Sequence, residues 1–189
     1  MLKGRMRLGM VMTKLRPTIK GFTIIELMIT LAVATILLGL AAPSFNDIIK
    51  DSRLTTQING LSASLNLARS EAIKRSLTVT VCKSANGTAC GGEWQQGWIV
   101  FVDNNGNGAV EAGNPDDTII RVNSVLSTGN TLIFPGKNRV TYKADGFAIG
   151  YNSTFTLCDG RGITKSKGLV VSNSGRVRTA NPSDLTSCT

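Results

Sequence analysis

The apolar positions divide this chain into three parts. Residues 22–42 are almost uniformly apolar over 21 residues, which as an α-helix measures roughly 31 Å, about one hydrocarbon core. After residue 43, apolar residues recur every three or four positions, the spacing of one helix face. Beyond about residue 76, short alternating runs predict β-strands. The recurring helical positions are Leu54, Ile58, Leu61, Leu65, Ala68 and Ala72.

These patterns predict a transmembrane helix over residues 22–42, an amphipathic continuation over 43–75 and a β-rich head over 76–189. No crossover helices are evident between the strand candidates, so the strands are expected to pair antiparallel. The predicted fold class is therefore α+β, with a long N-terminal helix packed on the head. The strand candidates are residues 77–81, 97–102, 118–125, 139–142, 154–157 and 168–171.

Basic residues are concentrated at the two ends of the chain. Residues 1–21 hold six basic residues and no acidic one, so removing them lowers the net charge from +9 to +3. This cluster predicts that the N-terminus stays in the cytoplasm and that the head crosses the membrane. From residue 121 onward, nine bases face three acids. That excess indicates either a solvated basic surface or a surface for an anionic partner.

Four cysteines follow the apolar segment, and the chain has no histidine. An even number on one side of a membrane indicates disulfides in an oxidising compartment. Of the three connectivities, we favour Cys82–Cys90, which closes a short polar loop, and Cys158–Cys188, which ties down the C-terminal tail. A structural metal site is not expected, because the chain has neither a histidine nor a C-x-x-C pair.

The junction between the basic and apolar parts does not match an ordinary secretory signal, because no favourable small-residue cleavage site follows the apolar stretch. Glu26 lies inside that stretch, where a carboxylate is costly and is by default a functional candidate. Cleavage after Gly21 would create an amino group on Phe22 that is a suitable counter-ion for Glu26, in the same or a neighbouring subunit. The alternative is a polar residue tolerated near the membrane interface.

The segment Lys20-Gly21-Phe22-Thr23-Ile24-Ile25-Glu26-Leu27-Met28 resembles the type IV pilin and pseudopilin superfamily. The resemblance implies cleavage between Gly21 and Phe22 by prepilin peptidase, N-methylation of Phe22 and a role for Glu26 in docking each new subunit. Pro43 lies where such pilins carry a proline that kinks the helix. The resemblance further implies a single-pass protein of the bacterial inner membrane, with a periplasmic head, that later joins other pilins in a pilus or pseudopilus.

Motifs in the head are similar to those of the GspH/FimT group of minor pilins and pseudopilins. The group includes the H component of type II secretion and minor pilins of type IV pili, among them a DNA-binding pilin for natural transformation. Neither catalysis nor a cofactor is expected, because no catalytic or phosphate-loop pattern is present. The similar segments are Cys82…Cys90, Trp94 to Asp103, Asn104 to Gly108, Ile119 to Arg121 and Gly168 to Arg178.

Two segments of the head are candidate binding sites. The first begins with Asp103, Asn105 and Asn107, which match the start of a calcium loop. Its twelfth position is Asn114 instead of the glutamate that such a loop needs. A β-turn explains the same residues without a metal, and we favour the turn.

The second candidate is Gly175-Arg176-Val177-Arg178, where Asn173-Ser174-Gly175 indicates a turn and Arg176 is expected to start a strand. Residues alternate along a strand, so Arg176 and Arg178 would share a face. The resemblance implies that both arginines contact DNA phosphates and that Gly175 permits the tight turn. Binding would be independent of sequence and sensitive to salt. Arg161, Lys165 and Lys167 lie in a preceding loop that is expected nearby.

The sequence therefore predicts a minor type IV pilin that captures DNA for uptake. Two alternatives share the leader, Glu26 and the fold. The first is a minor pilin that primes pilus assembly, with its arginines bridging neighbouring subunits. The second is the type II secretion pseudopilin H, part of a short periplasmic filament.

Overall fold

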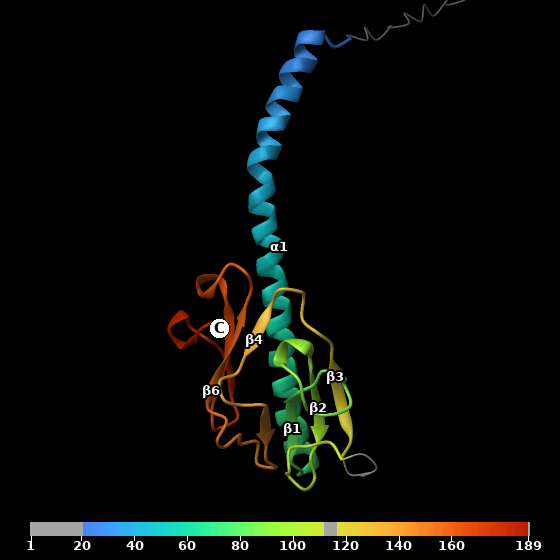
Figure 1. Ribbon diagram of the computed structural model, residues 1–189, viewed down its shortest axis with the longest axis vertical. Helices are drawn as coiled ribbons and strands as arrows, with labels where there is room; N and C mark the ends of the chain where they lie inside the picture. The colour runs from blue at the N-terminus through green and yellow to red at the C-terminus, as the bar shows by residue number, and fades with distance from the viewer. Residues whose placement is uncertain (1–20, 112–116, 189) are drawn as a thin grey trace, which may run out of the picture. The chain divides into compact units, whose positions relative to one another are not determined.

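The computed structural model describes residues 21–111 and 117–188, except for the side chains of residues 40–44. The predicted leader, apart from Gly21, lies outside the described residues. The chain divides into two compact units after Ser44, and one helix, α1 (Ile24–Arg75), belongs to both (Figure 1). The helical assignment continues through Pro43, and the predicted kink there stays a prediction.

The first unit contains the N-terminal part of α1. Thr23 caps this helix: its Oγ1 accepts a hydrogen bond from the backbone N–H of Glu26 at 3.2 Å, the usual way to satisfy a free amide of the first turn. The large apolar side chains from Phe22 to Leu38 are between 50% and 82% exposed. Among the described residues, the structure contains no helix with the length and hydropathy required of a bilayer-spanning segment.

The second unit, called here the globular unit, comprises residues 45–189. Its part of α1 packs on the sheets through the predicted apolar face, whose members are all 6% exposed or less. This confirms the face predicted from the spacing of three and four residues. The buried members are Leu54, Ile58, Leu61, Leu65, Ala68 and Ala72.

Two antiparallel sheets of four strands complete the globular unit (Figure 1). The first has the order β3-β2-β1-β5 and the second the order β4-β6-β7-β8, which confirms the α+β class. The first sheet consists of β1 (Val79–Lys83), β2 (Trp98–Val102), β3 (Ile119–Asn123) and β5 (Arg139–Tyr142). The second consists of β4 (Thr131–Ile133), β6 (Ser153–Cys158), β7 (Lys167–Val171) and β8 (Val177–Thr179).

All six strand candidates correspond to observed strands, within a few residues at the ends. The sequence did not predict β4, because three residues are too few to display an alternating pattern. The strand expected to start at Arg176 starts at Val177 instead. Arg176 nevertheless continues the β7–β8 ladder, since its carbonyl accepts the N–H of Ser172 at 3.0 Å.

The inner faces of both sheets and the buried face of α1 form one core. Within this core, the Phe134 and Phe155 rings are stacked with centroids 3.8 Å apart. Trp94, in the short helix η1 (Trp94–Gln96), meets Phe155 edge to face at 5.0 Å, a preferred aromatic geometry. Its indole N–H donates to the Lys137 carbonyl at 3.1 Å, so the buried polar atom is satisfied.

Each sheet also has an outer face that the chain itself covers. On the first sheet, Ile99 and Phe101 form a second small core with the Cys82–Cys90 disulfide. On the second sheet, the C-terminal tail, residues 180–188, crosses Thr156 and Gly168 and ends in the Cys158–Cys188 disulfide. Both disulfides have the pairing favoured from the sequence.

Candidate functional site

The edge strand β8 displays the two arginines of the G-R-x-R segment. Arg178 lies opposite Val170 on β7, and Val177 lies opposite Val171. Val177 packs against the core, so Arg176 and Arg178, one position to either side, point away from the core. Both arginines are exposed. Side chains two residues apart on a strand are roughly 6–7 Å apart.

Gly175 holds the turn before β8 tightly against a neighbouring loop. Its φ is +74°, and a Cβ at this position would collide with the carbonyl oxygen of Gly146. Gly175 N also donates to Ser172 O at 2.9 Å, which closes the turn. The requirement for glycine at this position is therefore structural, because both the dihedral angle and the close approach exclude a side chain.

Arg69 fixes this turn to the helix. Its Nε donates to the Gly146 carbonyl at 3.1 Å and its Nη2 donates to the Ser174 carbonyl at 3.3 Å. The sequence analysis did not identify Arg69. Its position beside Ala68 of the apolar face is the signal in the sequence, since a long side chain at the edge of a buried stripe can reach a neighbouring loop.

Arg178 is not free. Its Nη1 donates to Asp184 Oδ2 at 2.7 Å, and its Nη2 donates to Asp184 Oδ1 at 3.2 Å. Asp184 ends the short helix η3 (Pro182–Asp184) of the C-terminal tail. The hydrogen bond from Arg178 is the main cause that lowers the pKa of the Asp184 carboxyl. Arg176, by contrast, forms no ion pair with any described residue.

Arg161 differs from the other candidate arginines because it is largely buried and ion-paired, and its role on a DNA surface stays a prediction. Its side chain is 13% exposed, and its guanidinium forms ion pairs with Asp51 and Asp159, each at 2.7 Å, and with Asp47 at 3.4 Å. Three carboxylates thus neutralise it, and two of them, those of Asp47 and Asp51, join its loop to α1. The hydrogen bond from Arg161 lowers the pKa of Asp159.

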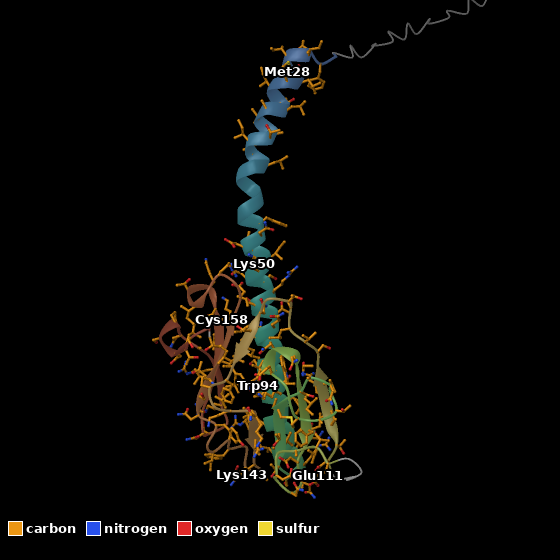
Figure 2. All side chains as sticks on the ribbon, viewed as in Figure 1. Met28, Lys50, Trp94, Glu111, Lys143 and Cys158 are labelled. Carbon is orange, nitrogen blue, oxygen red and sulfur yellow. A yellow bond between two sulfur atoms is a disulfide. The ribbon has the colours of Figure 1, made fainter. Side chains whose placement is uncertain are left out.

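Arg161 and the arginines of β8 also lie in different places. Arg161 contacts the two aspartates that flank Lys50, whereas the turn before β8 contacts the loop that starts at Lys143. Figure 2 shows Lys50 and Lys143 at opposite ends of the globular unit. The expectation that the loop of Arg161 lies close to the G-R-x-R segment is therefore not met.

The two lysines of that loop are exposed but lie along β7. Lys165 ends the short helix η2 (Ile163–Lys165), and Lys167 is the first residue of β7. Lys167 is three residues from Val170, the partner of Arg178, so the two backbones are separated by roughly 10 Å along the strand. The structure thus brings Arg176 and Arg178 together and leaves the lysines at a distance.

The loop packed against the turn adds side chains that the sequence analysis missed. Ala148 N donates to Asn173 O at 3.0 Å, and Lys143 N donates to Phe147 O at 2.9 Å. Phe147 and Ile149 are 44% and 60% exposed. A basic and an aromatic side chain therefore lie on the loop that touches the turn of Arg176.

The residues of the calcium-loop candidate do not form the ligand set of such a loop. The side-chain amides of Asn105 and Asn107 donate to Glu111, at 3.2 and 2.8 Å. Their Oδ1 atoms accept backbone N–H groups of the same loop, which is the arrangement of a polar turn. Asp103 is fully buried, and Asn114 lies outside the described residues.

At the other end of the chain, Gly21, Phe22 and Glu26 are exposed. Glu26 occupies the first turn of α1, where a negative charge is favoured by the helix dipole. This position gives Glu26 a local structural role in addition to the predicted assembly role.

Two family models match the chain. The one described as "Type II transport protein GspH" matches residues 57–175, and the "Prokaryotic N-terminal methylation motif" matches residues 16–42. The first covers well over half of the chain. The chain belongs to the GspH family. Together the two matches place it in the type IV pilin and pseudopilin superfamily, whose members are structural and not enzymatic components.

Known proteins agree with this membership. "Fimbrial protein Q" of Moraxella bovis is 41% identical over 69 residues, which is 36% of this chain and 43% of that protein. The chain therefore matches less than half the length of that relative. Two crystal structures of the type IV minor pilin FimU of Pseudomonas aeruginosa have TM-scores of 0.56 and 0.53, with 20% and 19% identity. They cover 75% and 71% of this chain and 99% of FimU, and they establish the fold.

Proposed function

We propose that this GspH-family protein is a minor type IV pilin that binds DNA, independently of its sequence, through Arg176 and Arg178. The observation that carries the proposal is the pair of exposed guanidiniums on one face of the edge strand β8. Their spacing of roughly 6–7 Å suits two neighbouring phosphates or one bidentate contact. Phosphate contacts of this kind give affinity without sequence preference.

The surroundings of the pair support an anionic partner. Lys143 and the exposed Phe147 lie on the loop that packs against the turn of Arg176. Arg178 already holds a carboxylate, that of Asp184, which is the geometry with which arginine also binds phosphate. Arg161 is excluded from the proposed surface because three carboxylates neutralise it.

The N-terminal region supports incorporation into a filament. The apolar side chains exposed along the first part of α1 need a lipid or protein environment, because large apolar surfaces rarely stay in water. We infer that prepilin peptidase cuts between Gly21 and Phe22, that Phe22 is N-methylated, and that its amino group pairs with Glu26 during assembly. The protein would reside in the inner membrane, with its globular unit in the periplasm, until it joins other pilins in a pilus.

The proposal is tested by titrating the detergent-solubilised chain with duplex DNA at several salt concentrations. Arg176→Gln and Arg178→Gln are each expected to weaken binding at low salt. Each change should also reduce the slope of log affinity against log salt by about 0.9, the value for one lost phosphate contact. Arg121→Gln is the matched control, because Arg121 is an exposed arginine on β3 of the other sheet. Equal affinities for all four proteins would contradict DNA binding at β8.

The alternatives make different predictions in cells. If the arginines bridge neighbouring subunits, the double variant loses pili and its DNA affinity is unchanged. If the protein is a secretion pseudopilin, deletion of its gene abolishes secretion of folded proteins and leaves transformation intact. Scoring transformation, piliation and secretion separately in the deletion strain distinguishes the three functions.

A further inference from the structure

The loop between β2 and β3 has one buried aspartate at its start and another, one residue before its end. Asp103 is fully buried, and Asp117 is 8% exposed. Val102 N donates to Thr118 O at 2.9 Å. This hydrogen bond extends the antiparallel pairing of β2 and β3 by one residue beyond the pair Phe101 and Ile119. Asp103 and Asp117 therefore occupy facing positions at the next step, where opposite Cα atoms are about 4.5–5.5 Å apart.

Each aspartate uses one oxygen to hold the same short segment of the loop. Asp103 Oδ2 accepts from Gly108 N at 3.0 Å and from Thr80 Oγ1 at 2.7 Å. Asp117 Oδ2 accepts from Glu111 N at 3.1 Å. Since Gly108 and Glu111 are three residues apart, the two carboxylates approach one small region from two sides.

The second oxygen of each carboxylate is unsatisfied. Asp103 Oδ1 and Asp117 Oδ1 are buried and have no hydrogen-bond partner among the described residues. The guanidinium of Arg139 lies beside Gly108, but its Nε donates to Tyr151 Oη at 3.3 Å. In the described part of the chain, Arg139 forms no ion pair with either aspartate. Two buried carboxylate oxygens without a hydrogen-bond or ion-pair partner are energetically costly.

We propose that Asp103 Oδ1 and Asp117 Oδ1 bind one Ca²⁺ ion. Calcium accepts carboxylate oxygens together with backbone carbonyls and water, in flexible geometry, whereas Mg²⁺ demands near-ideal octahedral geometry. This site differs from the calcium loop considered in the sequence, since Asn105 and Asn107 are committed to the turn. The ion would neutralise the aspartates and hold the segment from Gly108 to Glu111 against the second small core.

The site is tested on the full chain in detergent after treatment with a chelator. Unfolding of the globular unit is followed by the fluorescence of Trp94 and Trp98, which are both buried. Calcium at several millimolar exceeds the dissociation constants of about 10⁻⁴–10⁻³ M typical of extracellular sites. It should therefore raise the midpoint of unfolding by several degrees, and clearly more than Mg²⁺ or KCl at equal ionic strength. Calorimetry should show one saturable site per chain.

Variants assign the effect to the two aspartates. Asp117→Asn and Asp103→Asn should each abolish the calcium-dependent shift. Asp145→Asn is the control and should retain it, because Asp145 is exposed and lies outside this loop. If Asp103→Asn fails to fold, calcium titrations of the unchanged protein and of Asp117→Asn still show whether the site exists. Absence of saturable calcium binding, or a full shift in Asp117→Asn, would overturn the proposal.

Discussion

Arg178 on the edge strand β8 forms an ion pair with Asp184 in the C-terminal tail, with Nη1 and Oδ2 2.7 Å apart. The tail is held independently by the Cys158–Cys188 disulfide. A carboxylate of the same chain therefore occupies the edge of the guanidinium that a phosphate would use. Asp184 competes with any anionic ligand of Arg178.

Asp184→Asn should strengthen DNA binding. Exposed ion pairs are weak, so releasing Arg178 should raise the affinity at low salt by only about 1.5- to 5-fold. The salt slope should also become steeper, by at most about 0.9. Salt titrations of duplex binding measure both quantities. Glu93→Gln, which removes an exposed acid paired with Lys83, should change neither. A weaker complex with Asp184→Asn would argue against a phosphate contact at Arg178.

Gly175→Ala should destabilise the globular unit whether or not DNA binds. The new Cβ would collide with the Gly146 carbonyl at a φ of +74°, and we expect a loss of about 2–4 kcal/mol in the free energy of unfolding. Gly129→Ala is the matched control, because Gly129 has a φ of +85° and open space around it. It should lose only about 1 kcal/mol. Chemical denaturation measures the stability of both variants. Equal losses of stability would contradict the close contact between Gly175 and the Gly146 carbonyl.

Arg161→Gln should loosen the attachment of its loop to α1. The change removes ion pairs to Asp51 and Asp159 and leaves the largely buried Asp159 without its cation. We expect the midpoint of thermal unfolding to fall by several degrees and DNA affinity to stay unchanged. Arg121→Gln, at an exposed position, should be nearly neutral in stability. A drop in DNA affinity with Arg161→Gln at unchanged fold would restore Arg161 to the binding surface.

The stability difference between the native protein and Arg161→Gln should depend on pH. Arg161 lowers the pKa of Asp159 in the folded protein. The Asp159 carboxyl therefore binds a proton less readily in the folded state than in the unfolded state, where an aspartate has a pKa of about 3.9. The contribution is fully present above that value and is lost as the pH falls through the lowered pKa. Thermal unfolding at pH 7 and near pH 3 should show a large difference at pH 7 and a smaller one near pH 3. A difference that grows in acid would contradict this assignment.

Glu26→Gln should block incorporation into filaments while leaving the globular unit intact. The amide keeps the size of the side chain but removes the charge that would pair with the Phe22 amino group. Immunodetection in sheared filaments, compared with the total cellular amount, measures incorporation. Glu111→Gln, a change in the globular unit, should still incorporate. Normal amounts of the Glu26→Gln protein in filaments would refute the assembly role of Glu26.

Local periodicity made much of the fold predictable. The residues from Leu54 to Ala72 repeat every three or four positions, and all of them are buried as expected. The strand at 139–142 was predicted with the observed bounds. These signals depend on neighbours within one or two turns of a helix or one strand. For the candidate site, the sequence predicted that Arg176 and Arg178 share a face, because alternation along a strand is also local.

The sequence alone determined the helix face, most of the strands, the favoured disulfides and the spacing of the two arginines. The tertiary structure decided which charged side chains remain free to bind a partner. It brought Asp51, 110 residues away in sequence, to Arg161, placed Asp184 on Arg178 and pressed Gly175 against Gly146. Sequence patterns report periodicity over a few residues, whereas neutralisation of a charge depends on contacts between segments that only the packed chain brings together.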